Sequence, residues 1–446
     1  MLGVRGFSSF GSTLLLILFG LMPVQAVVKN PTLMELGAEE KIALNSRWDL
    51  GYYLFQIQEY AAAAREFEKI RVILPTDASL LALIGSCYSM AGRWQEGEIA
   101  LLQARSQNPD DDDINSLLGQ FYLSAGQPLK GAAYMEHSLR ITPEQEDLRA
   151  RLAVIYLDAG QVERAHEHLE ILLKAHGGQA FGDPEMDNEY ARCMVQLGKF
   201  KEGLAFADRA FRAEPSNTRF ARILGLCLMG NNRYEEASRM LAVGRGEVLA
   251  DADLYLQLGE AFFMDRHWEE AEKAWLDGVT RYPASYDIMS RLVEYYIGAA
   301  KPERARRVVA FAETRNPGNP GNLLLEARLK RKLSSYAAAW KALERLKRQS
   351  CGPLAKEAMW EEAQLDFATG KFGACDRMLD NLLLNKHRKS EAHLLKAKLA
   401  LQNGDKAAAQ AQVLEARNAN PYNLKVYALA KEAFSGSSEL AKLVQP

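Results

Sequence analysis

The spacing of the prolines is the strongest constraint on how this chain of 446 residues can fold. Pro75, Pro109 and Pro143 lie 34 residues apart, and Pro283 and Pro317 are separated by the same interval. A fixed period of roughly 20–50 residues marks repeat architectures. The chain is therefore expected to be an array of similar units.

Other residues follow the same period. A large apolar residue is repeatedly followed by a small one, as in Ile84/Gly85, Leu118/Gly119, Leu224/Gly225 and Leu258/Gly259. Small residues let two antiparallel helices approach closely, and large ones fill the groove to the next pair. Proline ends each unit because it is excluded from helix interiors but tolerated in the first turn of a helix. The pattern predicts an all-α chain of helix–turn–helix units.

The pattern resembles that of the tetratricopeptide repeat family, W-x2-L-G-x2-Y…A-x3-F…P over 34 residues. About eleven units can be counted, beginning near Leu44, Ala78, Asp112, Glu146, Pro184, Thr218, Ala252, Tyr286, Pro320, Lys356 and Ser390. The ninth and tenth are degenerate, with Ala327 and Ala363 in place of the glycine. The resemblance implies a right-handed superhelical solenoid of these units.

The segments outside the repeats complete the expected domain organisation. Residues 1–26 have the pattern of a secretory signal, with Arg5, an apolar run over Leu14–Met22 and a small-residue cleavage site at Ala26. An uncleaved anchor over residues 6–28 is the alternative. The remaining segments are a leading segment (27–43), the solenoid (44–421) with a four-residue insertion near 176–184, a capping helix (422–436) and a tail (437–446).

The charge is distributed unevenly along the chain. The net charge is −2, yet residues 301–400 carry 21 Lys/Arg against 11 Asp/Glu. Such asymmetry can mark an anionic partner or only a soluble surface. Export disfavours nucleic acid as that partner and makes a bacterial periplasm the expected location, with secretion or membrane anchoring as alternatives.

No enzyme motif withstands comparison with the repeat. Gly85-Ser86-Cys87-Tyr88 matches part of a papain-type signature. However, Cys193 and Cys227 occupy the same slot as Cys87 in other units, where a small apolar side chain packs between helices. We expect free, mostly buried thiols and no catalytic residue.

Metal and cofactor motifs are equally weak. His166 and His168 are two residues apart and do not share a helix face. The acidic run Pro109–Asp113 lacks the spaced ligands of a calcium loop and is expected to cap a helix instead. The sequence therefore predicts no metal site and no cofactor.

In tetratricopeptide repeats the first helix of each unit lines a concave groove that holds a peptide or a partner's helix. The resemblance implies that groove-facing positions here are occupied by Trp48, Tyr52, Phe55, Arg192, Arg219, Arg222, Glu260, Phe263, Met264, Arg328, Arg331, Lys332, Trp360, Phe367 and Lys398. Aromatic and Arg side chains are the usual hot spots of interfaces. Two alternatives remain open: Trp48 or Tyr52 packs against Met34–Ile42, and the basic residues of unit nine only solvate a degenerate repeat.

The functional expectation is a non-enzymatic, exported scaffold or adaptor. It would bind a partner protein or peptide in the groove and assist an envelope assembly or secretion machinery, a role that the resemblance implies. One alternative is a groove that binds an anionic polymer, such as an acidic polysaccharide, through Arg328, Arg331 and Lys332. Another is an accessory subunit of a separate enzyme.

Overall fold

The computed structural model describes residues 37–245, 250–349, 352–385, 387–419 and 424–434. Within these ranges the chain is built of helices and contains no strand. The expected signal (1–26) and tail (437–446) lie outside the described residues. The described helices form two compact units, divided between Gly182 and Asp183.

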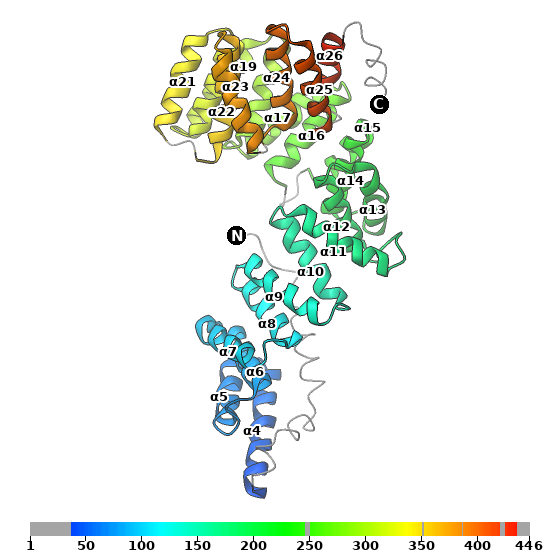
Figure 1. The fold of residues 1–446 in the computed structure, drawn as a ribbon, viewed down its shortest axis with the longest axis vertical. Helices are drawn as coiled ribbons and strands as arrows, with labels where there is room; N and C mark the ends of the chain where they lie inside the picture. The colour runs from blue at the N-terminus through cyan, green and yellow to red at the C-terminus, as the bar shows by residue number, and fades with distance from the viewer. Residues whose placement is uncertain (1–36, 246–249, 350–351, 386, 420–423, 435–446) are drawn as a thin grey trace. The chain divides into compact units, whose positions relative to one another are not determined.

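The first compact unit contains four helical hairpins (Figure 1). Their first helices are α4 (Ala38–Gln56), α6 (Ala78–Met90), α8 (Asp112–Ser124) and α10 (Glu146–Asp158). Their second helices are α5 (Tyr60–Arg71), α7 (Trp94–Gln107), α9 (Pro128–Ile141) and α11 (Val162–Ala175).

The second compact unit contains seven hairpins and a final single helix. The first helices are α12 (Pro184–Gln196), α14 (Thr218–Gly230), α16 (Ala252–Met264), α18 (Tyr286–Gly298), α20 (Pro320–Lys332), α22 (Ala355–Ala368) and α24 (Lys389–Gln402). The second helices are α13 (Phe200–Ala213), α15 (Tyr234–Val243), α17 (Trp268–Arg281), α19 (Pro302–Arg315), α21 (Tyr336–Arg348), α23 (Phe372–Leu384) and α25 (Lys406–Ala419). A short 3₁₀ turn (Gly352–Leu354) precedes α22, and the single helix is α26 (Leu424–Ala433).

The start of several hairpins follows from local chemistry. Side chains of Asp77, Asp111 and Asp251 each accept a hydrogen bond from a backbone N–H in the first turn of the helix that follows. Such caps satisfy amides that have no partner within the helix. The acidic run before α8 is therefore a helix cap, as expected from the sequence.

The turn and contact positions of the repeat explain its glycines. Gly92 joins α6 to α7 with a φ of +76°, a conformation that glycine adopts without strain. Gly85 lies against Leu101 of α7, and a Cβ atom there would lie 2.7 Å from the Leu101 Cγ. The large–small pattern thus marks close helix packing, as the sequence predicted.

The repeat period places the hairpins accurately except at the first one. Eight predicted units begin at the residue where the first helix begins, and those expected at Lys356 and Ser390 begin one residue earlier. Unit one, expected at Leu44, begins at Ala38, so part of the expected leading segment (27–43) is helical. The reason is local: Glu40 accepts the Gly37 N–H at 2.9 Å, and strong helix formers follow.

Candidate partner-binding site

The aromatic residues predicted for unit one pack mainly within their own hairpin. Trp48, Tyr52 and Phe55 are all half-buried on α4. The Trp48 ring lies edge-on to Phe67 of α5, with centroids 5.5 Å apart, and Phe55 contacts Tyr60 at 5.3 Å. Trp48 and Phe55 thus support the first hairpin.

The arginines predicted for units five and six form ion pairs. Arg192 pairs with Glu189 one turn earlier on α12, at 2.7 Å. Arg219 pairs with Glu185, one repeat earlier. Arg222 reaches forward to Asp251, at 2.8 Å, and its Nε donates to Gln257 at 3.0 Å. Arg219 and Arg222 therefore bridge neighbouring repeats.

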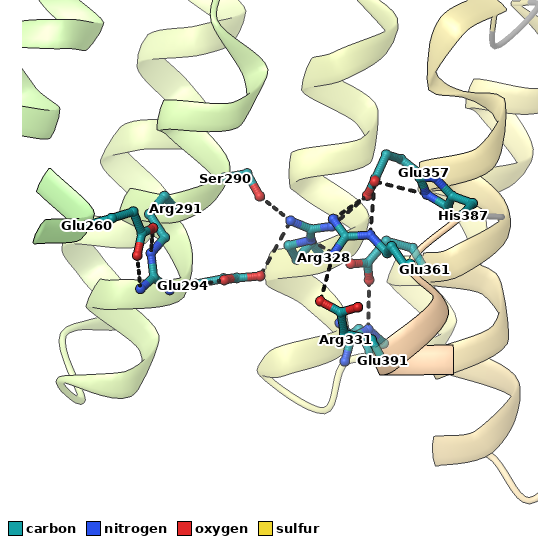
Figure 2. A network of polar contacts seen from close by, with 11 residues as sticks. Glu260, Ser290, Arg291, Glu294, Arg328, Arg331, Glu357, Glu361, His387 and Glu391 are labelled. Atoms are coloured by element: carbon teal, nitrogen blue, oxygen red, sulfur yellow. Dashed lines mark hydrogen bonds and ion pairs between the residues drawn. The ribbon is translucent and has the colours of Figure 1, made fainter. Parts of the chain in front are cut away.

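The same bridging becomes a continuous network in the later repeats (Figure 2). Its members lie on α16, α18, α20 and α22 and at the start of α24. Arg291 bonds Glu260 at 3.0 Å and approaches Glu294 at 3.5 Å, and Arg388 donates two 2.9 Å bonds to Glu357. Carboxylates of one repeat thus neutralise guanidiniums of the next.

Arg328 lies at the centre of this network and is buried. Its side chain is 4% exposed, and that of its partner Glu361 is 1% exposed. The Nε atom donates to Glu361 at 2.5 Å, Nη1 donates to Ser290, and Glu294 and Glu357 approach at 3.5 Å. Burial alone would lower the pKa of Arg328, but Glu361 reverses this and raises it.

This geometry corrects the expectation of an exposed basic patch in unit nine. Arg331 is occupied as well, because its Nε donates to the second Glu361 oxygen at 2.8 Å. Lys332 remains exposed. Repeat-to-repeat pairing was recognisable in the sequence, since Glu361 follows Arg328 by 33 residues, close to one period. Arg328 and Arg331 are therefore not available to an anionic polymer.

The residues predicted for units ten and eleven differ in burial. Trp360 is buried and Phe367 is half-buried, its ring 5.8 Å from that of Phe372 on α23. Lys398 on α24 is exposed. The two aromatics belong to the interior of their hairpin.

One predicted residue, Phe263, lines an open pocket of about 1060 Å³ formed by α16, α17, α18 and α19. Its apolar lining comes chiefly from Phe263, Trp268, Leu276 and Tyr295. Trp268 and Leu276 are 46% and 42% exposed, although both are large and apolar. We call this feature the Trp268 pocket. Glu260 and Met264, predicted beside Phe263, are not among its lining residues.

The aromatic rings of the Trp268 pocket rest on a buried support. Phe263 meets Trp268 edge-on, with centroids 4.9 Å apart, and meets Tyr295 at 6.3 Å. Below them lies Trp275, fully buried, whose Nε1 donates to the Leu256 carbonyl at 3.3 Å. Trp275 is 5.9 Å from Phe263 and 5.7 Å from Tyr295. The pocket wall is thus preorganised rather than a loose surface cluster.

Some of the charged side chains around the Trp268 pocket form ion pairs, and others do not. Arg291 stacks over Phe263 at 4.6 Å and is paired in the network, and Arg304 pairs with Glu272 at 2.7 Å. Lys273 and Lys301 also line the pocket, and the described residues provide neither with an ion-pair partner. Trp268, Tyr295 and these lysines escaped the sequence-based prediction, which used first-helix groove positions only.

The cysteines are buried in the helix packing, and the acidic cluster lies at the start of a helix. Cys87, Cys193, Cys227 and Cys375 are free and buried, as predicted, and Cys351 lies outside the described residues. Burial raises the pKa of the Cys87 thiol to about 12, so it is not a thiolate at neutral pH. Asp111, Asp112 and Asp113 lie close enough to share a cation, but Asp111 already caps α8.

A family comparison agrees with this architecture. Residues 99–240 match the model of a tetratricopeptide repeat family. The same helical hairpin recurs before and after the matched segment. The matched segment, residues 99–240, belongs to the tetratricopeptide repeat family. Tetratricopeptide repeat proteins are generally non-enzymatic, protein-binding scaffolds. Within the described ranges of this chain, no helix combines the length and apolarity needed to cross a bilayer.

Several solved structures are similar to this chain. Yeast Tom70 shares 11% identity, with 91% of this chain and 95% of that chain covered and a TM-score of 0.40. Pseudomonas aeruginosa pilF shares 14% identity over 48% and 95%, with a TM-score of 0.37. YrrB, described as having an unusual peptide-binding site, shares 16% over 47% and 98%, with a TM-score of 0.37. No curated protein sequence matches the chain. At these values the similarities identify neither a partner nor an activity.

Proposed function

We propose that this protein is an exported, non-enzymatic scaffold that binds a partner protein, and that the Trp268 pocket is a principal contact. The main observation in support is the pocket itself. It has a volume of about 1060 Å³ and is lined by Phe263, Trp268 and Tyr295, which lie over a buried tryptophan. Large aromatic side chains in preorganised pockets contribute most to protein–protein affinity.

The pattern of charges favours this pocket over the first-helix groove of the later repeats. There the guanidinium of Arg328 is already bonded by Glu361 and Ser290. A partner would have to break those bonds before gaining its own. At the pocket, by contrast, Lys273 and Lys301 are unpaired within the described structure. We infer a partner segment that inserts an apolar side chain between the rings and places a carboxylate near the lysines.

Export and a role in envelope assembly are part of the proposal. Their support is the signal-like pattern of residues 1–26. A protein isolated from the periplasm should begin at Val27; a chain that retains residues 1–26 in the membrane fraction would instead support an anchor.

The test is affinity capture from envelope extracts with a Trp268→Ala variant. Loss of a hot-spot tryptophan is expected to weaken binding by about 2 kcal/mol, or roughly 25-fold. Trp94→Ala is the matched control, because Trp94 also begins the second helix of its hairpin and is 42% exposed. A partner captured equally by both variants would exclude the pocket as the main contact.

A further inference from the structure

The second helices of the later repeats carry a group of basic side chains outside the Arg328 network. Arg307, Lys341 and Arg377 are each the sixth residue of a second helix, in α19, α21 and α23 of consecutive hairpins. Arg345 and Arg348 follow Lys341 by one and two turns and so lie on the same side of α21. All five side chains are exposed. We call this group the outer basic face.

The cations of the outer basic face have few partners within the chain. Arg345 approaches Glu326 of α20 at 3.7 Å, and the described residues provide the other four with no ion-pair partner. Helix α19 carries four Arg against two Glu, and α21 carries four Lys/Arg against one Glu. The neighbouring second helix α17 has the opposite balance, with two Lys/Arg against four Asp/Glu. The positive charge of α19 and α21 is therefore not neutralised by the chain itself.

The outer basic face follows a bend in the row of hairpins. First helices of neighbouring hairpins pack against one another, α18 with α20 and α20 with α22, whereas the described second helices α19, α21 and α23 do not pack together in this way. The row therefore curves with its second helices on the outside. Figure 1 shows the chain turning back at α21, so that α23 overlaps α19 in the view.

An electrostatic contact on the inner side agrees with this curvature. Burial, the charge of Arg331 and the charge of Lys425 on α26 all lower the pKa of Lys332 at the end of α20. Because α26 comes three repeats after α20, the row has to curl inward to bring these two lysines near each other. Arg307, Lys341 and Arg377 consequently face different directions around the bend.

The composition and curvature of the outer basic face indicate the kind of partner. Neither α19 nor α21 has a large apolar side chain among the exposed ones that the structure describes. A folded protein would find charges there but no aromatic or apolar anchor, which protein interfaces generally contain. A bilayer is flat and would reach only one part of a bent face. A flexible chain with charges along its length can follow the bend from one repeat to the next.

We propose that the outer basic face binds a linear anionic polymer of the acidic polysaccharide class. Its carboxylates contact Arg307, Lys341 and Arg377 in turn, at intervals of about 10 Å or more, because packed helices lie roughly 8–10 Å apart. The attraction is between exposed charges, so the affinity falls steeply as salt is added. This surface is separate from the Trp268 pocket, and the proposal does not depend on the one made for that pocket.

Fluorescence anisotropy with labelled polygalacturonate, a polymer of carboxylate-bearing sugars, tests the proposal on the full chain. The variant Arg307→Gln/Lys341→Gln/Arg377→Gln should weaken binding about tenfold at low salt, because three exposed charge contacts are lost together. It should also make the fall of affinity with salt less steep, since fewer counterions are released. Methyl-esterified polygalacturonate, which lacks the charges, should not bind.

The matched control is Arg65→Gln/Lys174→Gln/Lys201→Gln. These three cations are also exposed on second helices, α5, α11 and α13, so the variant removes the same charge and leaves the outer basic face intact. It should change the affinity for the polymer less than about twofold. Equal weakening by both triple variants would show that only net charge matters and would overturn the proposal.

Two further outcomes would also overturn it. One is an absence of binding to polygalacturonate at low salt, because a purely electrostatic site does not distinguish strongly among carboxylate polymers. The other is tighter binding of the full chain to vesicles of an anionic phospholipid than to the polymer, which would assign the face to a membrane surface. Trp268→Ala should leave polymer binding unchanged, so failure of this proposal and failure of the pocket proposal can be told apart.

Discussion

Replacing Arg328 with Met tests whether the network in α20 and α22 is structural. The side chains of Arg328 and Glu361 are 4% and 1% exposed. Removing either charge therefore leaves the other one buried without its partner. Breaking a buried ion pair in this way typically costs about 3–5 kcal/mol. Arg331 still bonds Glu361 at 2.8 Å, which places the expected loss for Arg328→Met near the lower limit, ~3 kcal/mol.

The double variant Arg328→Met/Glu361→Met isolates the interaction between the two side chains. If each single variant loses about 3 kcal/mol, the double variant should lose about 4 kcal/mol rather than the sum, a coupling of about 2 kcal/mol. Arg219→Met is the matched control, since its pair with Glu185 also joins neighbouring repeats but is 59% and 52% exposed. That exposed pair should contribute less than about 1 kcal/mol.

Urea unfolding followed by circular dichroism at 222 nm measures these losses. Repeat arrays need not unfold in one step, so amide exchange in α20 and α22 provides the local reading. The structural interpretation would be refuted if Arg328→Met lost no more stability than Arg219→Met, or if the single losses simply added.

Two further predictions follow from the second compact unit. Burial disfavours the charged form of Glu361, but Arg328 and Arg331 outweigh it and lower the pKa of its carboxyl. The ionised Glu361 therefore stabilises the folded state fully above the unfolded pKa of about 4.3, and this stabilisation is lost as the pH falls through the lower folded pKa. Arg328→Met should consequently reduce the change in the urea unfolding midpoint between pH 6 and pH 3. Gly259→Ala should cost about 1–3 kcal/mol, because the added Cβ would overlap the Trp275 indole. Gly373→Ala, with no atom within 4 Å of the added Cβ, is its control.

The outcomes that would contradict these two predictions are distinct. An unchanged acid dependence in Arg328→Met would mean that Glu361 is not held charged by that guanidinium. A stabilised Gly259→Ala variant would mean that the Trp275 ring moves freely and that only the better helix propensity of alanine is felt.

The period of the sequence was sufficient to locate the hairpins because most units repeat a small contact residue, and several repeat the same cap or turn residue. It failed at α4, where the Gly37 N–H donates to Glu40 and the helix begins at Ala38 rather than at the predicted Leu44. The sequence pattern also failed to predict which charged side chains are exposed. Family positions predict where a side chain lies on its helix, but whether Arg328 is exposed depends on an acidic residue one repeat later.

The Trp268 pocket was only half predicted for a related reason. Phe263 lies on a first helix, where the family pattern directs attention, and it was identified. Trp268 begins a second helix, and its sequence role resembles that of Trp94, which contacts Phe121 at 5.8 Å. Only the structure distinguishes the two, by the open pocket beside Trp268.

Site-specific photocrosslinking in the exporting cell is the most direct test of the proposed scaffold. A photoreactive phenylalanine analogue would replace Trp268 in one chain and Trp94 in another, two sites of similar exposure, 46% and 42%. We predict a covalent adduct with one partner protein from position 268 and none from position 94. Adducts of equal yield from both positions, or only from position 94, would contradict the claim that the Trp268 pocket holds the partner.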